Sequence, residues 1–429
     1  MSGLAPRTAA WRVLHDIRRG IPFDLSLERA LRAVPEADRG LAHEIAAGTL
    51  RHRSVLDAAI APHLDRGPDR IREDLLDILR LGAYQLLYLD RIPGHAAVDT
   101  AVSLGRRIAG ARVGGFINAV LRKVSEERGA MREVDVPASL LATRYSHPEW
   151  LIERWTARFG REGTERLLEI NNARPPLVVQ PARWDGETLI ASFEQQQIIW
   201  RPAPFGAGLV VEGRRPRELP GFAAGSCFVQ DPAQALVVRF CERAQGSAVF
   251  DACAAPGGKA IAFSGQGFVA AADLRPARAR RLRENLLRAG RGPAAVLAAD
   301  AAHPPVRPMP AVLLDAPCLG TGTFSRHPDA RWRVTPEALA TLAREGGRLL
   351  RTLAEVVAPG GLLFFATCSL EPEENEVQID GFLAEDRRFR REPGAMAQRE
   401  LLTPAGDLML LPHIHGTDGA YASRLRRTN

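Results

Sequence analysis

Residues Asp251-Ala-Cys-Ala-Ala-Pro-Gly-Gly-Lys259 decide the fold of the second half of this chain. An apolar run at 248–250 precedes them and a helix-compatible run at 260–263 follows, which predicts a strand, a glycine-rich loop and a helix. In an open α/β sheet such a loop lies at the carboxyl ends of the strands, where ligands bind. Gly257 and Gly258 let a backbone approach a ligand closely. The loop is neither a GxGxxG nor a Walker motif, so it indicates neither a dinucleotide nor a triphosphate, and an ordinary βα turn remains the alternative.

Beyond residue 231, apolar runs alternate with helical segments, which predicts a doubly wound α/β sheet. Seven strands are expected, at residues 248–251, 268–273, 295–299, 311–315, 361–367, 408–411 and 421–425. Four of the first five end in, or lead directly to, an acidic residue, namely Asp251, Asp273, Asp300 and Asp315. One such residue could simply cap a helix. Four at the same edge of a sheet indicate a ligand site, since a carboxylate after the second strand usually holds a ribose.

The first 230 residues follow a different pattern. Apolar residues between 71 and 86 recur at spacings of three and four, and residues 1–130 are expected to form an α-helical bundle. Short strand-like runs with a helix between them predict a small α+β module over 140–230. The polar stretch 126–139 is the expected linker between the two.

Composition narrows the class of protein. The 429 residues are 46% hydrophobic and 25% charged, as in a soluble globular chain, and no apolar run approaches a membrane span, so a cytoplasmic protein without membrane contact is expected. The five cysteines show no CxxC pair or metal-ligand spacing, which predicts free thiols and no metal site. A net charge of +7 fits a polyanionic partner such as nucleic acid, although a genome that prefers arginine codons would produce the same excess.

Two cysteines follow neighbouring strands of the predicted sheet. Asp315-Ala-Pro-Cys318 ends the fourth strand, and Ala366-Thr-Cys-Ser369 ends the fifth. Adjacent strand ends would place both thiols and the Asp315 carboxylate over the glycine-rich loop. This set fits cytosine C5 alkylation, because C5 becomes nucleophilic only after a thiolate adds to C6, and cysteine is partly thiolate near neutral pH. A lone cysteine is more often a small buried hydrophobe, so the interpretation depends on the pair.

These motifs closely resemble those of the RNA cytosine-C5 methyltransferases. The resemblance rests on Asp251–Lys259, Asp315–Cys318 and Thr367–Ser369, followed by Glu371-Pro-Glu-Glu-Asn375. The helical front end resembles a NusB-like RNA-binding domain in three phrases, Arg7-Thr-Ala-Ala-Trp-Arg-Val-Leu14, Gly48-Thr-Leu-Arg51 and Phe116-Ile-Asn-Ala-Val-Leu-Arg122. The combination is similar to the RsmB (Sun/Fmu) family of small-subunit ribosomal RNA methyltransferases.

The resemblance implies a multidomain protein. Residues 1–130 would be a NusB-like, all-α RNA-binding domain, 140–230 a small α+β RRM-like module, and 231–429 a Rossmann-like α/β methyltransferase domain with a seven-stranded, mostly parallel sheet. The implied cofactor is S-adenosyl-L-methionine. The implied partner is RNA, either 16S ribosomal RNA or a small-subunit assembly intermediate.

The resemblance also assigns roles to the catalytic residues. Cys368 would be the nucleophile that adds to C6, and Cys318 would assist release of the product. Asp315 would face the methionine end of the cofactor and the target base. The run Arg326–Asp329 and Trp332 match family phrases and would shape the RNA pocket.

The remaining implied residues hold the cofactor. Asp273 would bind the ribose hydroxyls with Arg278 close by, and Asp300 would meet the adenine. The loop would contribute Cys253, Ala254, Ala255, Pro256, Gly257, Gly258 and Lys259.

Other functions remain open. The chain departs from the family pattern at Leu319, at Ala420 and in a short segment between Lys259 and Asp273. The product would be 5-methylcytidine in 16S ribosomal RNA, and a transfer RNA cytosine-C5 methyltransferase is the nearest alternative. A non-catalytic RNA-binding or assembly factor is disfavoured because both cysteines and all the site acids are present. DNA methylation is disfavoured by the thiol that follows Thr367 and by the NusB-like front end.

Overall fold

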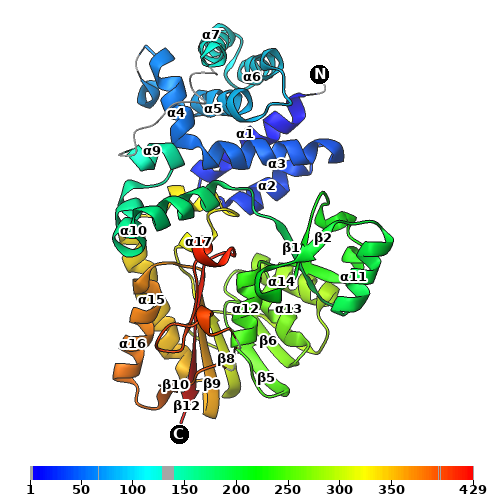
Figure 1. Ribbon diagram of the computed structural model, residues 1–429, viewed down its shortest axis with the longest axis vertical. Helices are drawn as coiled ribbons and strands as arrows, with labels where there is room; N and C mark the ends of the chain where they lie inside the picture. Colours follow the sequence, from blue (N-terminus) through cyan, green and yellow to red (C-terminus); the bar gives the residue numbers. More distant parts are fainter. Residues whose placement is uncertain (1–2, 66, 128–139, 395, 397, 429) are drawn as a thin grey trace. The chain divides into compact units, whose positions relative to one another are not determined.

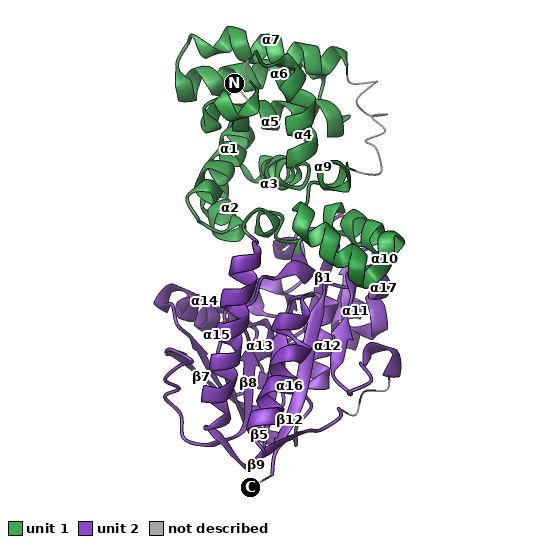
Figure 2. Ribbon diagram, turned by 90° about the vertical axis from the view of Figure 1, so that its left-hand side faces the viewer, with its two compact units in different colours: residues 1–173, 324–333 green, residues 174–323, 334–429 purple. Residues whose placement is uncertain are grey.

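The computed structural model describes residues 3–65, 67–127, 140–394, 396 and 398–428. The chain divides into two compact units, one of residues 1–173 and 324–333, the other of 174–323 and 334–429 (Figure 2). The expected linker at 126–139 lies almost entirely outside the described residues.

The first unit is helical throughout its described residues. Its centre is α5 (Glu73–Tyr88), which begins with two acidic residues in its first turn and is buried along nearly its whole length. The apolar stripe that predicted this helix packs in the core beside residues such as Ile45 and Leu121. The surrounding helices are α1 Leu4–Arg18, α2 Phe23–Leu31, α3 Glu36–Arg51, α4 Arg53–Ile60, α6 Gly94–Ala109, α7 Val113–Glu126, α9 Leu141–Tyr145 and α10 Glu149–Asn172.

A distant segment completes this helical unit. Residues 324–333, here called the strap, follow the Cys318 motif in sequence but pack within the helices. The fully buried Arg331 guanidinium donates to Asn172 Oδ1 at 2.6 Å, and burial lowers its pKa to about 9. The Trp332 indole donates to the Leu50 carbonyl at 2.9 Å. Arg331 and Trp332 of the strap therefore have structural partners inside the first unit.

The second unit contains a small four-stranded antiparallel sheet in the order β2-β3-β1-β4. Its strands are β1 Leu177–Pro181, β2 Trp200–Pro202, β3 Leu209–Val211 and β4 Cys227–Val229. Helix α11 (Gly186–Gln195) covers it, and its N-terminus is capped by the Asp185 carboxylate, which accepts from Thr188 N at 2.8 Å. The strand-like runs expected at 177–179 and 209–211 and the helix between them are confirmed, the run expected at 198–200 overlaps β2 only at Trp200, and β4 was not predicted.

The large sheet of the second unit has the order β10-β12-β9-β8-β5-β6-β7, with β11 paired to β12 (Figure 1). Strands β5 to β9 are parallel to one another, and β10, β11 and β12 are antiparallel additions. The strands are β5 Gly246–Asp251, β6 Gly267–Asp273, β7 Ala294–Ala298, β8 Met309–Asp315, β9 Val357–Thr367, β10 Phe389–Arg391, β11 Leu408–Leu410 and β12 Ala420–Arg427. Eight strands replace the expected seven, because the edge strand β10 is too short and too charged to be recognised from its sequence.

Helices cover both faces of this sheet. Neighbouring strand residues point to opposite faces, so that Val249 lies in one buried cluster with α12 to α14, and Phe250 lies in the other with α15 and α16. These helices are α12 Pro232–Phe240, α13 Gly258–Ser264, α14 Pro276–Ala289, α15 Pro336–Ala354 and α16 Glu376–Glu385, with the short α17 Pro412–His415 between β11 and β12. None of the helices in the described residues is long and apolar enough to cross a membrane.

Candidate active site

The site lies where the chain order of the large sheet reverses. From β5 the chain proceeds through β6 to β7, and then returns to place β8 on the other side of β5. A crevice at the carboxyl ends of the strands forms at such a switch point, and ligands of open α/β sheets bind there. Asp251 ends β5 and Asp315 ends β8, so both carboxylates stand at this point.

The glycine-rich loop between β5 and α13 needs its glycines. Gly257 has φ +113°, a backbone conformation that side chains rarely adopt. A Cβ at Gly257 would lie 2.8 Å from Leu282, and a Cβ at Gly258 would lie 2.8 Å from Gln230. The loop is therefore held close to its surroundings, and a substitution at either glycine would push it outward.

A buried ion pair joins this loop to β8. The Lys259 ammonium donates to Asp315 Oδ2 at 2.7 Å and also to the Gln234 side chain. Burial lowers the pKa of Lys259, but the Asp315 carboxylate more than offsets this, so the net shift is upward and the lysine stays charged. This pairing explains why a lysine stands here in an arginine-rich chain, since the site holds a compact point charge.

Asp251 is a buried carboxyl without a hydrogen-bond partner for either oxygen among the described residues. Burial raises its pKa to about 7, and the neighbouring Asp315 carboxylate acts in the same direction. A perturbed acid in a crevice is a marker of function rather than of structure.

The remaining acids stand at the neighbouring strand ends. Asp273 ends β6, is buried, and accepts from Arg275 N at 3.1 Å and from the Arg278 guanidinium at 3.2 Å. Arg278 also donates to the Ala255 carbonyl of the loop at 2.7 Å, so it ties Asp273 to the glycine-rich loop. Asp300 follows β7, is half-exposed, and accepts from Ala302 N at 2.9 Å.

Both predicted thiols meet over β8 and β9. These strands are parallel neighbours, with Asp315 opposite Ala366. The Sγ atoms of Cys318 and Cys368 lie 3.5 Å apart, within hydrogen-bonding distance for sulfur. The hydrogen bond to Cys368, followed by burial, raises the pKa of Cys318, so this side chain is a thiol near neutral pH.

The thiol-bearing loops are fixed by backbone contacts. Gly322 N donates to the Cys368 carbonyl at 3.0 Å, and Gly419 N donates to the Gly322 carbonyl at 2.8 Å. A Cβ on Gly322 would lie 2.6 Å from the Gly419 Cα, so the two glycines allow a close backbone approach. Gly419 precedes β12 and stands next to Ala420, one of the departures from the family pattern.

Glu374 is a site residue to which the sequence assigned no role. Leu319 N donates to Glu374 Oε1 at 2.9 Å and to Oε2 at 3.2 Å. Glu374 is buried, and burial raises its pKa to about 7. Its charge also contributes to the raised pKa of Cys318. The signal was the run Glu371–Asn375, whose role appears only when the chain brings it back to the Cys318 loop.

The departure at Leu319 leaves this contact intact, because Leu319 takes part through its backbone N–H. The neighbouring Asn375 is buried and donates to the Ser369 carbonyl at 2.9 Å, while the Thr367 hydroxyl donates to its Oδ1 at 2.5 Å. The run that follows Cys368 therefore holds both thiol loops at once.

The other three cysteines are not comparable to this pair. Cys227 and Cys241 are buried, and burial raises the pKa of Cys241 to about 12. Cys253 lies in the glycine-rich loop, where burial and then the Asp251 charge raise its pKa to about 12. Within the described residues, no group of three or more His, Cys, Asp or Glu side chains could hold a metal ion.

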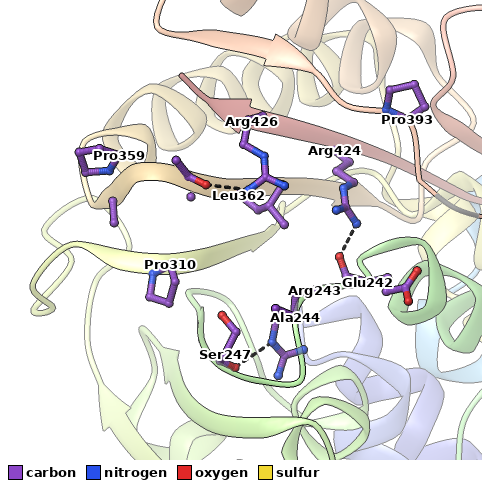
Figure 3. A pocket seen from close by; sticks show the side chains of 13 residues that line it. Glu242, Arg243, Ala244, Ser247, Pro310, Pro359, Leu362, Pro393, Arg424 and Arg426 are labelled. Carbon is purple, nitrogen blue, oxygen red and sulfur yellow. Dashed lines mark hydrogen bonds between the residues drawn. The ribbon is translucent and has the colours of Figure 1, made fainter. Parts of the chain in front are cut away.

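A separate cavity of about 520 Å³ lies at the opposite, amino-terminal edge of the sheet (Figure 3). It is lined by the beginnings of β8 and β9 and by Arg243, Arg424 and Arg426. None of the predicted site residues lines it.

Family models match the chain in three consecutive stretches. Residues 4–126 match the NusB family, and residues 147–216 match the ferredoxin-like domain of RsmF/B-like methyltransferases. Residues 239–426 match the 16S rRNA methyltransferase RsmB/F.

Similar proteins cover almost the whole chain. The probable ribosomal RNA small subunit methyltransferase B of Synechocystis is 33% identical, over 99% of this chain and all of that protein. The ribosomal RNA small subunit methyltransferase B of Pseudomonas putida is 36% identical, over 98% of both chains. The corresponding protein of Thermus thermophilus is 34% identical, over 99% of this chain and 98% of its own.

Solved structures share the fold. One crystal structure covers 97% of this chain and 98% of its own with a TM-score of 0.83 and 24% sequence identity. A methyltransferase homologue from Pyrococcus horikoshii covers 67% of this chain and 97% of its own with a TM-score of 0.57 and 25% identity.

Proposed function

We propose that this chain, which belongs to the RsmB/F family of 16S rRNA methyltransferases, moves a methyl group from S-adenosylmethionine to C5 of a cytosine in 16S ribosomal RNA. The observation that carries the proposal is the pair of thiols, 3.5 Å apart at neighbouring strand ends, beside the Lys259–Asp315 ion pair.

The residues present fit S-adenosylmethionine. This molecule has a cationic sulfonium, an ammonium and a ribose, and when bound it supplies the methyl group. Asp273 would accept the ribose hydroxyls, with Arg278 fixing its position, and Asp300 would meet the adenine. Asp251 has two buried oxygens without a hydrogen-bond partner among the described residues, as a cationic ligand would require. Gly257 and Gly258 let the loop pack against Leu282 and Gln230, so that it keeps its position at the carboxyl ends of the strands.

Cys368 is proposed as the nucleophile. Its sulfur forms a bond to C6 of the cytosine, and the ring electrons shift so that C5 gains carbanion character. Asp315 would support this step by taking up a proton from solvent and donating it to N3, which neutralises the developing negative charge on the ring. The Cys318 thiol can donate to the sulfur of Cys368 and thereby stabilise its thiolate before addition.

Cys318 is proposed to assist the last step. Once C5 carries the methyl group, its proton must leave before the electron pair can return to the ring and break the C6–sulfur bond. Cys318, after releasing its own thiol proton to solvent, would take the C5 proton as a thiolate, directly or through a water molecule. The hydrogen bond to Cys368 is the first cause of the raised pKa of Cys318, so formation of the covalent adduct would remove this constraint.

The domains around this site are assigned by the same proposal. Residues 1–130 would recruit RNA, in keeping with their match to the NusB family. Residues 140–230 would help to hold the RNA, and residues 231–429 would carry out the reaction.

Incubation with S-adenosylmethionine and separate RNA pools tests the proposal. We expect 5-methylcytidine, detected by nucleoside mass spectrometry and placed by bisulfite sequencing, in 16S ribosomal RNA or a small-subunit intermediate. If the methylated cytosine appears only in transfer RNA, or only in DNA, that nucleic acid is the substrate in place of 16S ribosomal RNA. Stabilisation of the protein by S-adenosylmethionine without product in any pool would indicate a non-catalytic role.

A further inference from the structure

The second unit carries five arginines that lack acidic partners among the described residues, four of them exposed and Arg288 half-buried. They lie where α14 meets the small four-stranded sheet and are here called the arginine stripe, consisting of Arg183, Arg280, Arg283, Arg288 and Arg291. Among the described residues, none of these five guanidinium groups forms an ion pair with a carboxylate.

Three members of the arginine stripe are held by uncharged acceptors. Arg183 donates to the Leu287 carbonyl at 2.5 Å, and Arg288 donates to the Phe222 carbonyl at 2.7 Å. Arg291 donates to the Trp184 carbonyl at 2.6 Å and to the Ala182 carbonyl. A carbonyl orients a guanidinium without neutralising it, so the positive charges remain and the side chains are already ordered.

The other two members extend the stripe along α14. Arg280, Arg283 and Leu287 follow spacings of three and four, so they share one face of the helix. That face is exposed, and Leu287 itself is 66% exposed. Because the Leu287 carbonyl accepts from Arg183, the helix face continues directly into the edge of the small sheet.

Some arginines elsewhere in the same unit are neutralised by carboxylates. Arg424 and Arg426 share the Glu392 carboxylate, and Arg388 pairs with Glu355 and Asp386. The acids nearest the arginine stripe in sequence are Asp185, whose carboxylate caps α11, and Glu284 on α14. The arginine stripe therefore brings together, where α14 meets the small sheet, five guanidinium groups that no described carboxylate neutralises.

We propose that the arginine stripe binds the phosphate backbone of the RNA substrate and forms an RNA contact within the second unit. The inference rests on the proposed function for the nature of the substrate. Guanidinium groups match phosphate oxygens in geometry and charge, and contacts of this kind position a nucleic acid without reading its sequence. The module that contains the small sheet then has a specific task, because its carbonyls order Arg288 and Arg291 and it contributes Arg183, which α14 holds.

The test uses the two members that make no structural contact. In the double variant Arg280→Gln/Arg283→Gln we expect weaker binding of the RNA substrate. The slope of the logarithm of the binding constant against the logarithm of the salt concentration should also become smaller in magnitude, by about 1 for each phosphate contact that is lost. The variant Arg280→Lys/Arg283→Lys keeps the charge and should retain most of the affinity. Arg307→Gln/Arg390→Gln is the matched control, since it removes two exposed arginines far from the stripe in sequence.

The outcomes separate this inference from the proposed function. Stabilisation by S-adenosylmethionine and turnover at saturating RNA should be unchanged in the stripe variant, whereas the RNA concentration for half-maximal rate should rise. If stripe and control variants lose equal affinity, or neither loses any, the inference is overturned while the proposed function stands. If the stripe variant keeps its affinity for RNA but no longer binds an acidic protein, the stripe is a protein-binding surface and the inference is overturned as well. If the wild-type protein methylates no RNA, the proposed function itself fails.

Discussion

The two edges of the large sheet differ in how their polar groups are satisfied. The amino-terminal edge has a cavity of about 520 Å³, but Arg424 and Arg426, two of the three arginines that line it, pair with Glu392. Arg426 also donates to the Gly360 carbonyl (Figure 3). The carboxyl-terminal edge has two thiols in contact and the fully buried carboxyl of Asp251. Perturbed groups, rather than volume, mark the proposed active site.

The pKa shifts run in opposite directions at the two edges. At the amino-terminal edge, hydrogen bonds from Arg426 and then Arg424 lower the pKa of Glu392 to about 2, which keeps a structural carboxylate charged. At the carboxyl-terminal edge, burial raises the pKa of Asp251 and of Glu374 to about 7. Acids poised near neutral pH can exchange protons during a reaction, whereas Glu392 cannot.

The largest expected effect is that of Cys368→Ala at the carboxyl-terminal edge. Turnover on the cognate RNA should fall by at least about 10³-fold, because no route to the C6 adduct remains. Stabilisation by S-adenosylmethionine should persist, since the cofactor residues lie on the loops after β5, β6 and β7. Near-normal turnover in this variant would mean that the nucleophile has been misassigned, and Cys318 would become the candidate.

Cys318→Ala should produce a different defect. Addition and methyl transfer remain possible, so the enzyme should accumulate as a methylated RNA–protein adduct that survives denaturing electrophoresis and disappears after nuclease treatment. Cys253→Ala is a matched control and should show no such band, because Cys253 lies in the glycine-rich loop. Free turnover of Cys318→Ala without an adduct would make this thiol a structural residue.

Glu374→Gln should change how stability depends on pH. The pKa of Glu374 is raised to about 7 in the folded protein, so the wild type binds this proton more tightly when folded and loses stability as pH rises towards 7. A glutamine cannot ionise. The variant should therefore gain up to about 3 kcal/mol relative to the wild type in unfolding free energy between pH 5 and pH 8.

Urea denaturation at both pH values measures this difference. Glu373→Gln makes the same chemical change at the adjacent position and serves as the control. Parallel pH dependence of the wild type and Glu374→Gln would show that the carboxyl is already charged in the folded protein near pH 5.

The smallest effect is expected at the amino-terminal edge. Arg426→Gln should leave methylation unchanged and reduce the unfolding free energy by about 1 kcal/mol or less, because the pair with Glu392 is partly exposed and screened by water. Denaturation and methylation assays on the same preparation check both points. A large loss of activity would mean that the amino-terminal cavity takes part in the reaction after all.

Sequence patterns predicted the parallel strands and the pair of cysteines well, because both follow from short stretches of sequence. Apolar runs mark buried parallel strands, and residues at the ends of neighbouring strands must meet at one edge. The pairing of Lys259 with Asp315 was not predictable in the same way, since these residues come together only through the strand order. Glu374 was seen as part of a motif, but its contact with Leu319 N depends on the return of the chain beside β8.

Short elements and buried charges account for the rest of the difference. Strands β4 and β10 have three residues each and were not predicted, and two of the three residues of β10 are arginines. The resemblance to the family assigned Arg326–Asp329 and Trp332 to an RNA pocket, and that role stays a prediction. The sequence did not predict the full burial of Arg331, whose hydrogen bonds to Asn172 and to backbone carbonyls satisfy it within the helical unit.

The strap also sets an order of events during synthesis. The helical unit needs residues 324–333, which leave the ribosome only after residues 174–323 have been made. At about 5–20 residues per second, this delay lasts roughly 8 to 30 s. Until then the nascent helices lack the Trp332 indole that bonds to the Leu50 carbonyl, and the N–H of Phe23 lacks its acceptor, the Asp329 carboxylate. The amino-terminal domain therefore cannot reach its final packing until much of the methyltransferase domain has been synthesised.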